Sequence, residues 1–327
     1  MKAFIKYISY YLPEKEFTNQ EIENLFPEWD GAKIVSKIGI KTRHISDKDQ
    51  TTSDLGVAAI ENLCTEYKID KKDIDYLIVC TQSPDYFLPT TACVIQNNTG
   101  LPTSCAALDI NQGCSGYVYA LSLAKGLVVS GIAKNVIIVT AESYSKFIHP
   151  DDKGNRSIFG DASSATLISD NGLYEIENFV LGSDGSGYEN LIVRNGASKN
   201  IKTNSENDPD NFLFMDGPAI FKFTIDSVPQ LVKDTLIKNN ATLEDIEQFI
   251  FHQANTYMLD FLRKRIKIPT EKFIIDMEDY GNTVSSTIPI VLKNLISKEQ
   301  NEDKLLLAGF GVGYSWGAVC LKKHAND

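Results

Sequence analysis

The sequence predicts a layered α/β fold, and two observations support this prediction. Short runs of β-branched and other apolar residues recur at 76–80, 135–140, 248–251 and 305–308. Continuous apolar runs of this length are typical of strands buried on both faces of a sheet. A segment between two of these runs, 116–129, places apolar residues at helical spacing. Strands that alternate with helices indicate helices packed in layers against a sheet.

An internal repeat predicts that the fold consists of two related halves. Three pairs of segments match in pattern at an offset of about 170 positions: 73–82 with 245–254, 108–114 with 275–282, and 135–139 with 304–308. A chain of 327 residues is also longer than one hydrophobic core usually supports. We therefore expect two copies of one α/β unit, the first spanning residues 1–175 and the second spanning residues 176–327.

Composition and charge argue against several classes of partner. The net charge is −11, and no basic stretch is interleaved with aromatic residues, so most of the surface should repel nucleic-acid phosphates. No apolar run reaches the roughly 18 residues that a membrane span needs. Residues 1–10 alternate like a strand and lack the apolar core of a signal peptide. We expect a cytoplasmic protein that binds neither nucleic acid nor membranes.

The sequence predicts no metal and no cofactor. Its cysteines share no metal-ligand spacing and lie mostly among apolar residues; they are Cys64, Cys80, Cys93, Cys105, Cys114 and Cys320. The glycine-rich segment 309–317 lacks the lysine and the helix of a phosphate-binding loop. For five of the six cysteines we expect a role in core packing.

Cys114 is the exception, because it follows an apolar run and a glycine turn and precedes a helical pattern. A helix N-terminus favours a thiolate over a thiol. The flanking Gly113 and Gly116 allow the backbone to approach a ligand closely, so that the sulfur can attack a thioester and form an acyl-enzyme. On this segment alone, a buried structural cysteine is an equally good interpretation.

Four motifs in order give the chain a specific resemblance. They are Cys114-Ser-Gly, Phe251-His252-Gln-Ala-Asn255, Tyr280-Gly-Asn282-Thr and the glycine-rich 309–317. The chain resembles the β-ketoacyl-acyl-carrier-protein synthase III family of condensing enzymes, with similarity along almost its whole length. This resemblance implies the thiolase-like fold, in which two duplicated halves form five layers (αβαβα). The nucleophilic cysteine then lies in the first half, and the histidine and asparagine lie in the second.

The resemblance also implies the chemistry. Cys114 is the acyl-carrying nucleophile, and His252 and Asn282 are its catalytic partners. Decarboxylation of a malonyl thioester leaves an enolate, whose oxygen an amide NH₂ and a neutral imidazole N–H can stabilise by hydrogen bonds. The backbone N–H groups of Cys114 and Val312 are expected to form the oxyanion hole for acyl transfer. The family usually has glycine where this chain has Val312, which allows far fewer backbone conformations.

By the same resemblance, the substrate-binding residues are Lys33, Lys37, Lys153, Leu88 and Asn255. The three lysines occupy positions where relatives that use acetyl-coenzyme A have a tryptophan and arginines. Lysine can neither stack as tryptophan does nor offer the planar fork of arginine, so a carrier-bound acyl donor becomes credible beside coenzyme A. Leu88 takes a position that usually closes the acyl pocket of the partner subunit. We therefore expect acyl carrier protein and an acyl thioester as partners, and a homodimer.

Three alternatives stay open at this point. A papain-like cysteine hydrolase also has Cys, His and Asn in this chain order, but its Cys-Gly-Ser-Cys-Trp context is absent and its fold is not duplicated. A non-catalytic partner subunit would have the same fold, although such subunits generally lose the nucleophile. A relative that transfers the acyl group to oxygen or nitrogen without decarboxylation would share every motif.

Overall fold

The computed structural model describes the chain except residues 201–204, 206–207, 299–301 and 325–327, and at residues 33 and 34 it describes the backbone alone. The strands are β1 (Phe4–Tyr11), β2 (Glu16–Thr18), β3 (Thr42–His44), β4 (Tyr76–Cys80), β5 (Ala106–Ile110), β6 (Val136–Glu142), β7 (Ala162–Ser169), β8 (Tyr174–Ser183), β9 (Leu191–Val193), β10 (Leu213–Met215), β11 (Gln248–Phe251), β12 (Lys304–Gly311) and β13 (Ser315–Lys323). The α-helices are α1 (Asn19–Leu25), α2 (Gly31–Ile38), α3 (Thr52–Tyr67), α4 (Thr91–Thr99), α5 (Gly116–Val129), α6 (Lys153–Arg156), α7 (Gly217–Lys238), α8 (Thr256–Ile266) and α9 (Thr287–Ser297).

Nine of these strands form one mixed sheet, in the order β11-β12-β13-β8-β1-β7-β6-β4-β5. Outward from the central pair β8 and β1, the strands on both sides follow the same order of antiparallel and then parallel pairing. On one side β1, β7 and β6 are antiparallel neighbours and β6, β4 and β5 are parallel; on the other side β8, β13 and β12 are antiparallel and β12 and β11 are parallel. The repeat in the sequence is therefore a repeat of topology.

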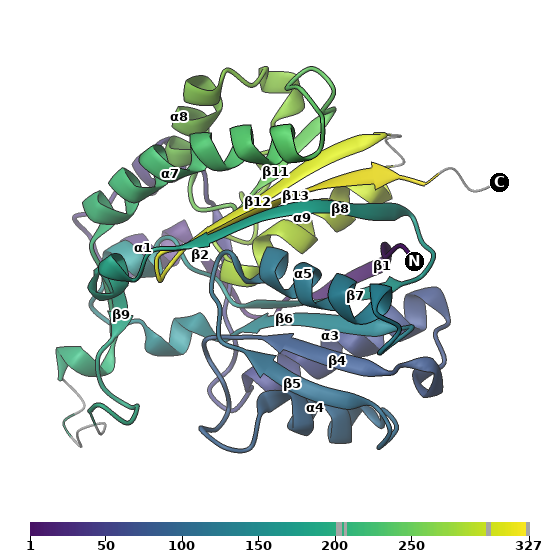
Figure 1. Ribbon diagram of the computed structural model, residues 1–327. Helices are drawn as coiled ribbons and strands as arrows, with labels where there is room; N and C mark the ends of the chain where they lie inside the picture. The colour runs from purple at the N-terminus through teal and green to yellow at the C-terminus, as the bar shows by residue number, and fades with distance from the viewer. Residues whose placement is uncertain (201–204, 206–207, 299–301, 325–327) are drawn as a thin grey trace.

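The helices divide the fold into five layers (Figure 1). Helices α3 and α4 cover the outer face of β4–β7, where Ile60 and Leu63 pack with Val79. Helices α7 and α8 cover the outer face of β11–β13. Helices α5 and α9 lie between the two sides of the sheet, and Leu121 and Leu292 share one core with strands of both. The predicted αβαβα layering of two duplicated halves is confirmed.

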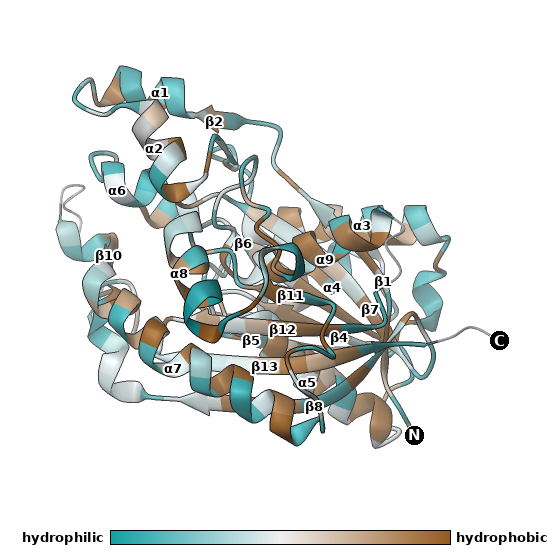
Figure 2. Cartoon of the chain, turned by 90° about the horizontal axis from the view of Figure 1, so that it is seen from above, coloured by the Kyte–Doolittle hydropathy of each residue, from teal (hydrophilic) through white to brown (hydrophobic). Residues whose placement is uncertain are grey.

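Hydropathy explains why the central elements are buried. Strands β4 and β11 coincide with the predicted runs 76–80 and 248–251, and α5 coincides with the predicted helix 116–129. These elements are largely brown in Figure 2, whereas the loops at the edge of the molecule are mostly teal. Strand β12 begins one residue before its predicted run and ends three residues after it, at Gly311, which extends it towards Cys114. No helix in the described part of the chain is long and apolar enough to cross a membrane.

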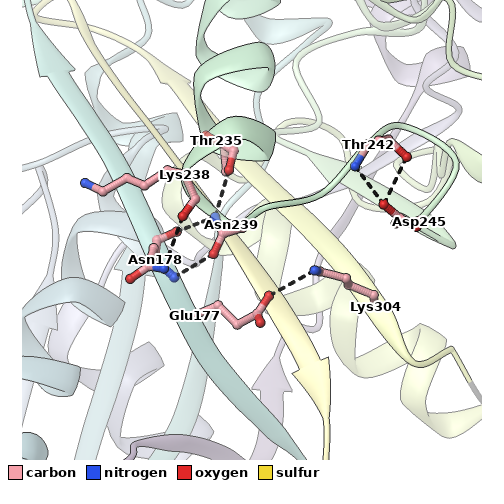
Figure 3. Close-up of polar contacts among 8 residues, drawn as sticks. All are labelled: Glu177, Asn178, Thr235, Lys238, Asn239, Thr242, Asp245 and Lys304. Carbon is pink, nitrogen blue, oxygen red and sulfur yellow. Dashed lines mark hydrogen bonds and ion pairs between the residues drawn. The ribbon is translucent and has the colours of Figure 1, made fainter.

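The boundary predicted between residues 175 and 176 falls inside β8 and stays a prediction. The end of α7 is tied to this strand by side-chain amides (Figure 3). The Asn239 carboxamide accepts a hydrogen bond from the Asn178 N–H at 2.9 Å and donates to the Asn178 carbonyl at 3.0 Å and the Thr235 carbonyl at 2.8 Å. Two of these bonds satisfy the backbone groups of Asn178 where the pairing of β8 with β13 is irregular, and the third joins the same side chain to the last turn of α7.

Candidate active site

Cys114 lies in the short connection between β5 and α5. Ser115 is the N-cap of α5, so Cys114 precedes the first helical turn by two residues. The Ser115 side chain does not cap the helix; its hydroxyl lies 2.7 Å from the Ser315 hydroxyl in the other half of the fold. The sequence placed Cys114 at a helix start, and the structure places it just outside that start, at the contact between the two halves.

Two glycines of β12 form the opposite side of this contact. A Cβ atom built on Gly311 would lie 2.9 Å from Cys114 Cβ and 3.0 Å from Cys114 Sγ. A Cβ atom on Gly309 would lie 2.8 Å from the Cys114 carbonyl oxygen. Real side-chain carbons do not approach so closely, so Cys114 reaches its position only because these residues lack a side chain.

His252 follows β11 directly and is 2% exposed. Its backbone N–H donates to the Ala308 carbonyl at 2.8 Å, which continues the parallel pairing of β11 with β12. The Phe310 ring meets the imidazole edge-on, with 5.8 Å between the ring centroids. The imidazole Nδ1 lies 2.8 Å from the hydroxyl of Thr287, the first residue of α9.

The backbone and the side chain of Asn282 each form a hydrogen bond with a backbone group. Its N–H donates to the Ile158 carbonyl at 2.9 Å, after a turn in which Gly281 has a φ of +71°. Its side-chain oxygen accepts the Val284 N–H at 2.9 Å. Because the oxygen is occupied, the amide NH₂ is the part of the side chain that remains available as a donor.

These three residues meet in one cavity of about 380 Å³, whose lining is otherwise mostly apolar. Asn255 lines the same cavity and also caps α8, since its side-chain oxygen accepts the Met258 N–H at 2.9 Å. A larger groove of about 1020 Å³ lies beside the cavity, and Leu191 lines both. An acyl chain on Cys114 would therefore contact mostly apolar side chains.

Burial controls the protonation of the site. It raises the pKa of the Cys114 thiol to about 12, with a further contribution from the nearby Glu142 carboxylate, while the Cys114 backbone N–H acts in the opposite direction. Burial lowers the pKa of His252 to about 3. At neutral pH the resting site thus holds a thiol and a neutral imidazole. The thiolate expected from the helix N-terminus is not the resting state, because desolvation outweighs that effect.

Val312 and Leu88 line the larger groove. Val312 belongs to the apolar cluster around Cys114, and its carbonyl accepts the Ser315 hydroxyl at 2.8 Å. The positive φ of this turn falls on Gly313, at +135°, so Val312 does not need the backbone freedom of glycine. Leu88 is 83% exposed on a loop with Tyr86 and Phe87. The roles predicted for Val312 and Leu88 stay predictions.

Of the three lysines, Lys37 and Lys153 are not among the residues that line the cavity. The Lys33 side chain is outside the described part of the chain, and Lys37 is exposed. Lys153 forms an ion pair with Glu28 at 2.6 Å, and its ammonium lies 5.9 Å from the centre of the Trp29 ring. The sequence analysis matched the three lysines together to the tryptophan and arginine positions of relatives. The structure places Trp29, which precedes Lys33 by four residues, beside Lys153.

Two site residues escaped the sequence analysis, Val284 and Thr287. Val284 has a φ of +54°, a conformation that is unusual and strained for a β-branched residue. Its N–H donates to the Asn282 side-chain oxygen, and its carbonyl oxygen lies 3.0 Å from the Thr287 hydroxyl. No local sequence signal marks a valine at positive φ.

In the described part of the chain, no group of histidine, cysteine and acidic side chains could hold a metal ion.

Comparisons with known proteins agree with this architecture. Residues 108–185 match the family model "3-Oxoacyl-[acyl-carrier-protein (ACP)] synthase III", and residues 236–323 match its C-terminal counterpart. A β-ketoacyl-[acyl-carrier-protein] synthase III of Clostridium perfringens is 35% identical, with 95% of this chain and 96% of that protein covered.

Solved structures give the same result. A crystal structure of a 3-oxoacyl-(acyl-carrier-protein) synthase III superposes with a TM-score of 0.95 at 42% identity, covering 99% of this chain and 100% of that chain. A 3-oxoacyl-(acyl-carrier-protein) synthase of Burkholderia xenovorans LB400 gives 0.92 at 35% identity, covering 99% and 94%. A priming β-ketosynthase of the R1128 polyketide pathway gives 0.86 at 26% identity, covering 98% and 96%. The chain has the thiolase fold and belongs to the β-ketoacyl-acyl-carrier-protein synthase III family of acyltransferases.

Proposed function

We propose that this chain forms an acyl-enzyme on Cys114 and condenses it with a malonyl-type thioester carried by acyl carrier protein. The product is a 3-oxoacyl thioester, made at the initiation of fatty-acid synthesis or in a related secondary pathway. The observation that carries the proposal is one apolar cavity lined by a thiol, an imidazole and a carboxamide, from Cys114, His252 and Asn282. A homodimer in the cytoplasm is part of the same proposal, on the grounds of family resemblance.

In the first half-reaction, Cys114 Sγ attacks the carbonyl carbon of the acyl thioester. The carbon–sulfur bond of the donor breaks, and the thiol proton ends on the departing thiol. The resting thiol ionises only as the donor binds, and the Cys114 N–H and the N-terminus of α5 favour the negative charge on sulfur and on the carbonyl oxygen. The Val312 N–H is the second proposed donor to that oxygen.

In the second half-reaction, the malonyl carboxylate leaves as carbon dioxide, and its bonding electrons form an enolate. Asn282 offers an NH₂ donor, because its oxygen is already bound by Val284. His252 is neutral, so an N–H on Nε2 can provide the second donor. The enolate carbon then attacks the acyl carbonyl carbon, and Cys114 leaves as a thiolate that regains a proton.

Intact-mass analysis separates this function from its alternatives. After incubation with an acyl thioester, the protein should gain one acyl group, and the group should be absent in Cys114→Ala. Cys93→Ala is the matched control, because Cys93 is the exposed cysteine of the described chain. Addition of malonyl-carrier protein should then discharge the acyl group and release carbon dioxide.

Two outcomes would contradict the proposal. Discharge onto an alcohol or amine without carbon dioxide release would identify acyl transfer to oxygen or nitrogen. An adduct that persists in Cys114→Ala would remove the nucleophile from its role.

A further inference from the structure

The geometry points to Thr287 as a positioning residue: we propose that its hydroxyl donates to His252 Nδ1 and thereby keeps the imidazole proton on Nε2, facing the reacting thioester. This inference rests on the proposed function, since it concerns how His252 becomes a donor to the enolate oxygen. Thr287 belongs to none of the four motifs that carry the family resemblance.

The contact is short and enclosed. Nδ1 and the Thr287 oxygen are 2.8 Å apart, and the two residues are 2% and 3% exposed. Thr287 is the first residue of α9, whereas His252 ends the strand β11 from a distant part of the sequence. A neutral imidazole has one N–H and one bare nitrogen, and the hydrogen bond at one nitrogen decides which of the two carries the proton.

The Thr287 hydroxyl faces two acceptors but has only one proton. It lies 3.0 Å from the Val284 carbonyl and 2.8 Å from His252 Nδ1. If it donates to the carbonyl, Nδ1 must carry the imidazole proton and Nε2 is bare. If it donates to Nδ1, the proton is on Nε2. Stabilisation of an enolate oxygen requires a donor, and a bare nitrogen would instead place a lone pair against the developing negative charge.

If the Thr287 hydroxyl is removed, the Val284 carbonyl remains as the partner of His252. The Val284 carbonyl shares the Thr287 hydroxyl with His252 Nδ1, and hydrogen bonding from the Val284 backbone raises the pKa of His252, as a carbonyl acceptor does. A carbonyl oxygen can only accept, so without the hydroxyl it selects the tautomer with the proton on Nδ1. Thr287→Val, which keeps the shape of the side chain, should therefore convert the face of His252 towards the cavity from a donor into an acceptor.

Histidine-selective ¹⁵N NMR tests the tautomer directly, because a protonated and a bare ring nitrogen have different chemical shifts. The chain has four histidines, and loss of one set of signals in His252→Ala identifies the relevant ring. We expect the proton on Nε2 in the wild-type protein and in Thr287→Ser, and on Nδ1 in Thr287→Val. A wild-type spectrum with the proton on Nδ1 would overturn the inference whether or not the variants fold.

Activity provides the second measurement. Thr287→Val should lose about 10²–10³-fold in decarboxylation of malonyl-carrier protein, the usual effect of losing one oxyanion donor, while acyl-enzyme formation continues. Thr287→Ser should restore decarboxylation. The matched control is Thr235→Val, since Thr235 is a fully buried helix residue whose hydroxyl also binds a carbonyl, that of Leu231 at 2.8 Å, outside the site.

The control should retain both the tautomer and the activity. Thr287→Val with an unchanged tautomer, or with a changed tautomer and full decarboxylation, would refute the inference while leaving the proposed function intact. Failure of the wild-type protein to acylate Cys114 would refute the proposed function instead, and the spectra would still report the tautomer.

Discussion

Replacement of Asn282 by alanine should separate the two half-reactions. The Asn282 oxygen accepts the Val284 N–H, so only its NH₂ group is available to the enolate oxygen. Losing one oxyanion donor costs about 2.7–4 kcal/mol of transition-state stabilisation, or about 10²–10³-fold in rate. Acyl-enzyme formation should stay close to the wild-type level, because the proposed donors in that step are backbone N–H groups of Cys114 and Val312.

The same change should also weaken the fold by a measurable amount. Val284 is 1% exposed, so its N–H would be left buried without a partner. Such a group costs about 1–3 kcal/mol in the free energy of unfolding. Asn155→Ala is the matched control, since Asn155 is equally buried at 5% exposure but lies outside the cavity lining, where its amide donates to Asp152.

The assay follows both steps in one sample. Intact mass reports the acyl group on Cys114, and carbon dioxide release from malonyl-carrier protein reports decarboxylation; urea unfolding reports stability. Asn155→Ala should lose stability and keep decarboxylation. If Asn282→Ala fails equally at acylation and decarboxylation, the proposed division of roles is wrong.

Three further predictions concern stability, chain length and the acyl donor. Asn239→Ala should lower the free energy of unfolding, measured in urea, by about 1–2 kcal/mol, because its side chain makes three hydrogen bonds to backbone groups. Asn178→Ala should lower it by less, because that side chain makes one longer bond of 3.3 Å. Equal effects of the two changes would contradict this prediction. Leu191→Ala should join the cavity to the larger groove and shift acyl-enzyme formation, measured by mass over a chain-length series, towards longer chains; an unchanged preference would show that another residue sets the limit. The ratio kcat/KM for one acyl chain should be higher when the donor is carrier-bound than when it is a coenzyme A thioester. A selective loss of the coenzyme A reaction in Trp29→Ala would show that Trp29, beside Lys153, replaces the missing stacking residue.

Features that depend on neighbours in the sequence were predictable. Strands β4 and β11 coincide with apolar runs, and α5 coincides with a helical pattern, because the burial of each element leaves its period in the sequence. The cavity brings together Cys114, His252 and Asn282, which family motifs had already singled out. These motifs stand beside glycines and strand ends, where backbone geometry restricts the residue type.

Features that depend on contacts across the fold were not predictable. The helix N-terminus favours a thiolate at Cys114, but the pKa of the thiol is raised because the second half of the chain covers it. Trp29 precedes Lys33 by four residues, yet the fold brings it to Lys153. Thr287 binds His252 only because β11 and α9 end up side by side.

The duplication also explains why the residues of the proposed catalytic site come from both halves. Cys114 and Asn282 occupy matching positions of the repeat, each after a glycine and shortly before a central helix. The turn Val284–Ser286 that leads into α9 packs against α5, so the beginnings of both central helices lie close to the cavity. Helix N-termini favour negative charge. In the proposed mechanism, the same backbone feature would favour negative charge on the sulfur and the acyl oxygen in one half and on the malonyl enolate in the other. On this proposal, a substitution at position 282 should change the second step while acylation of Cys114 is retained.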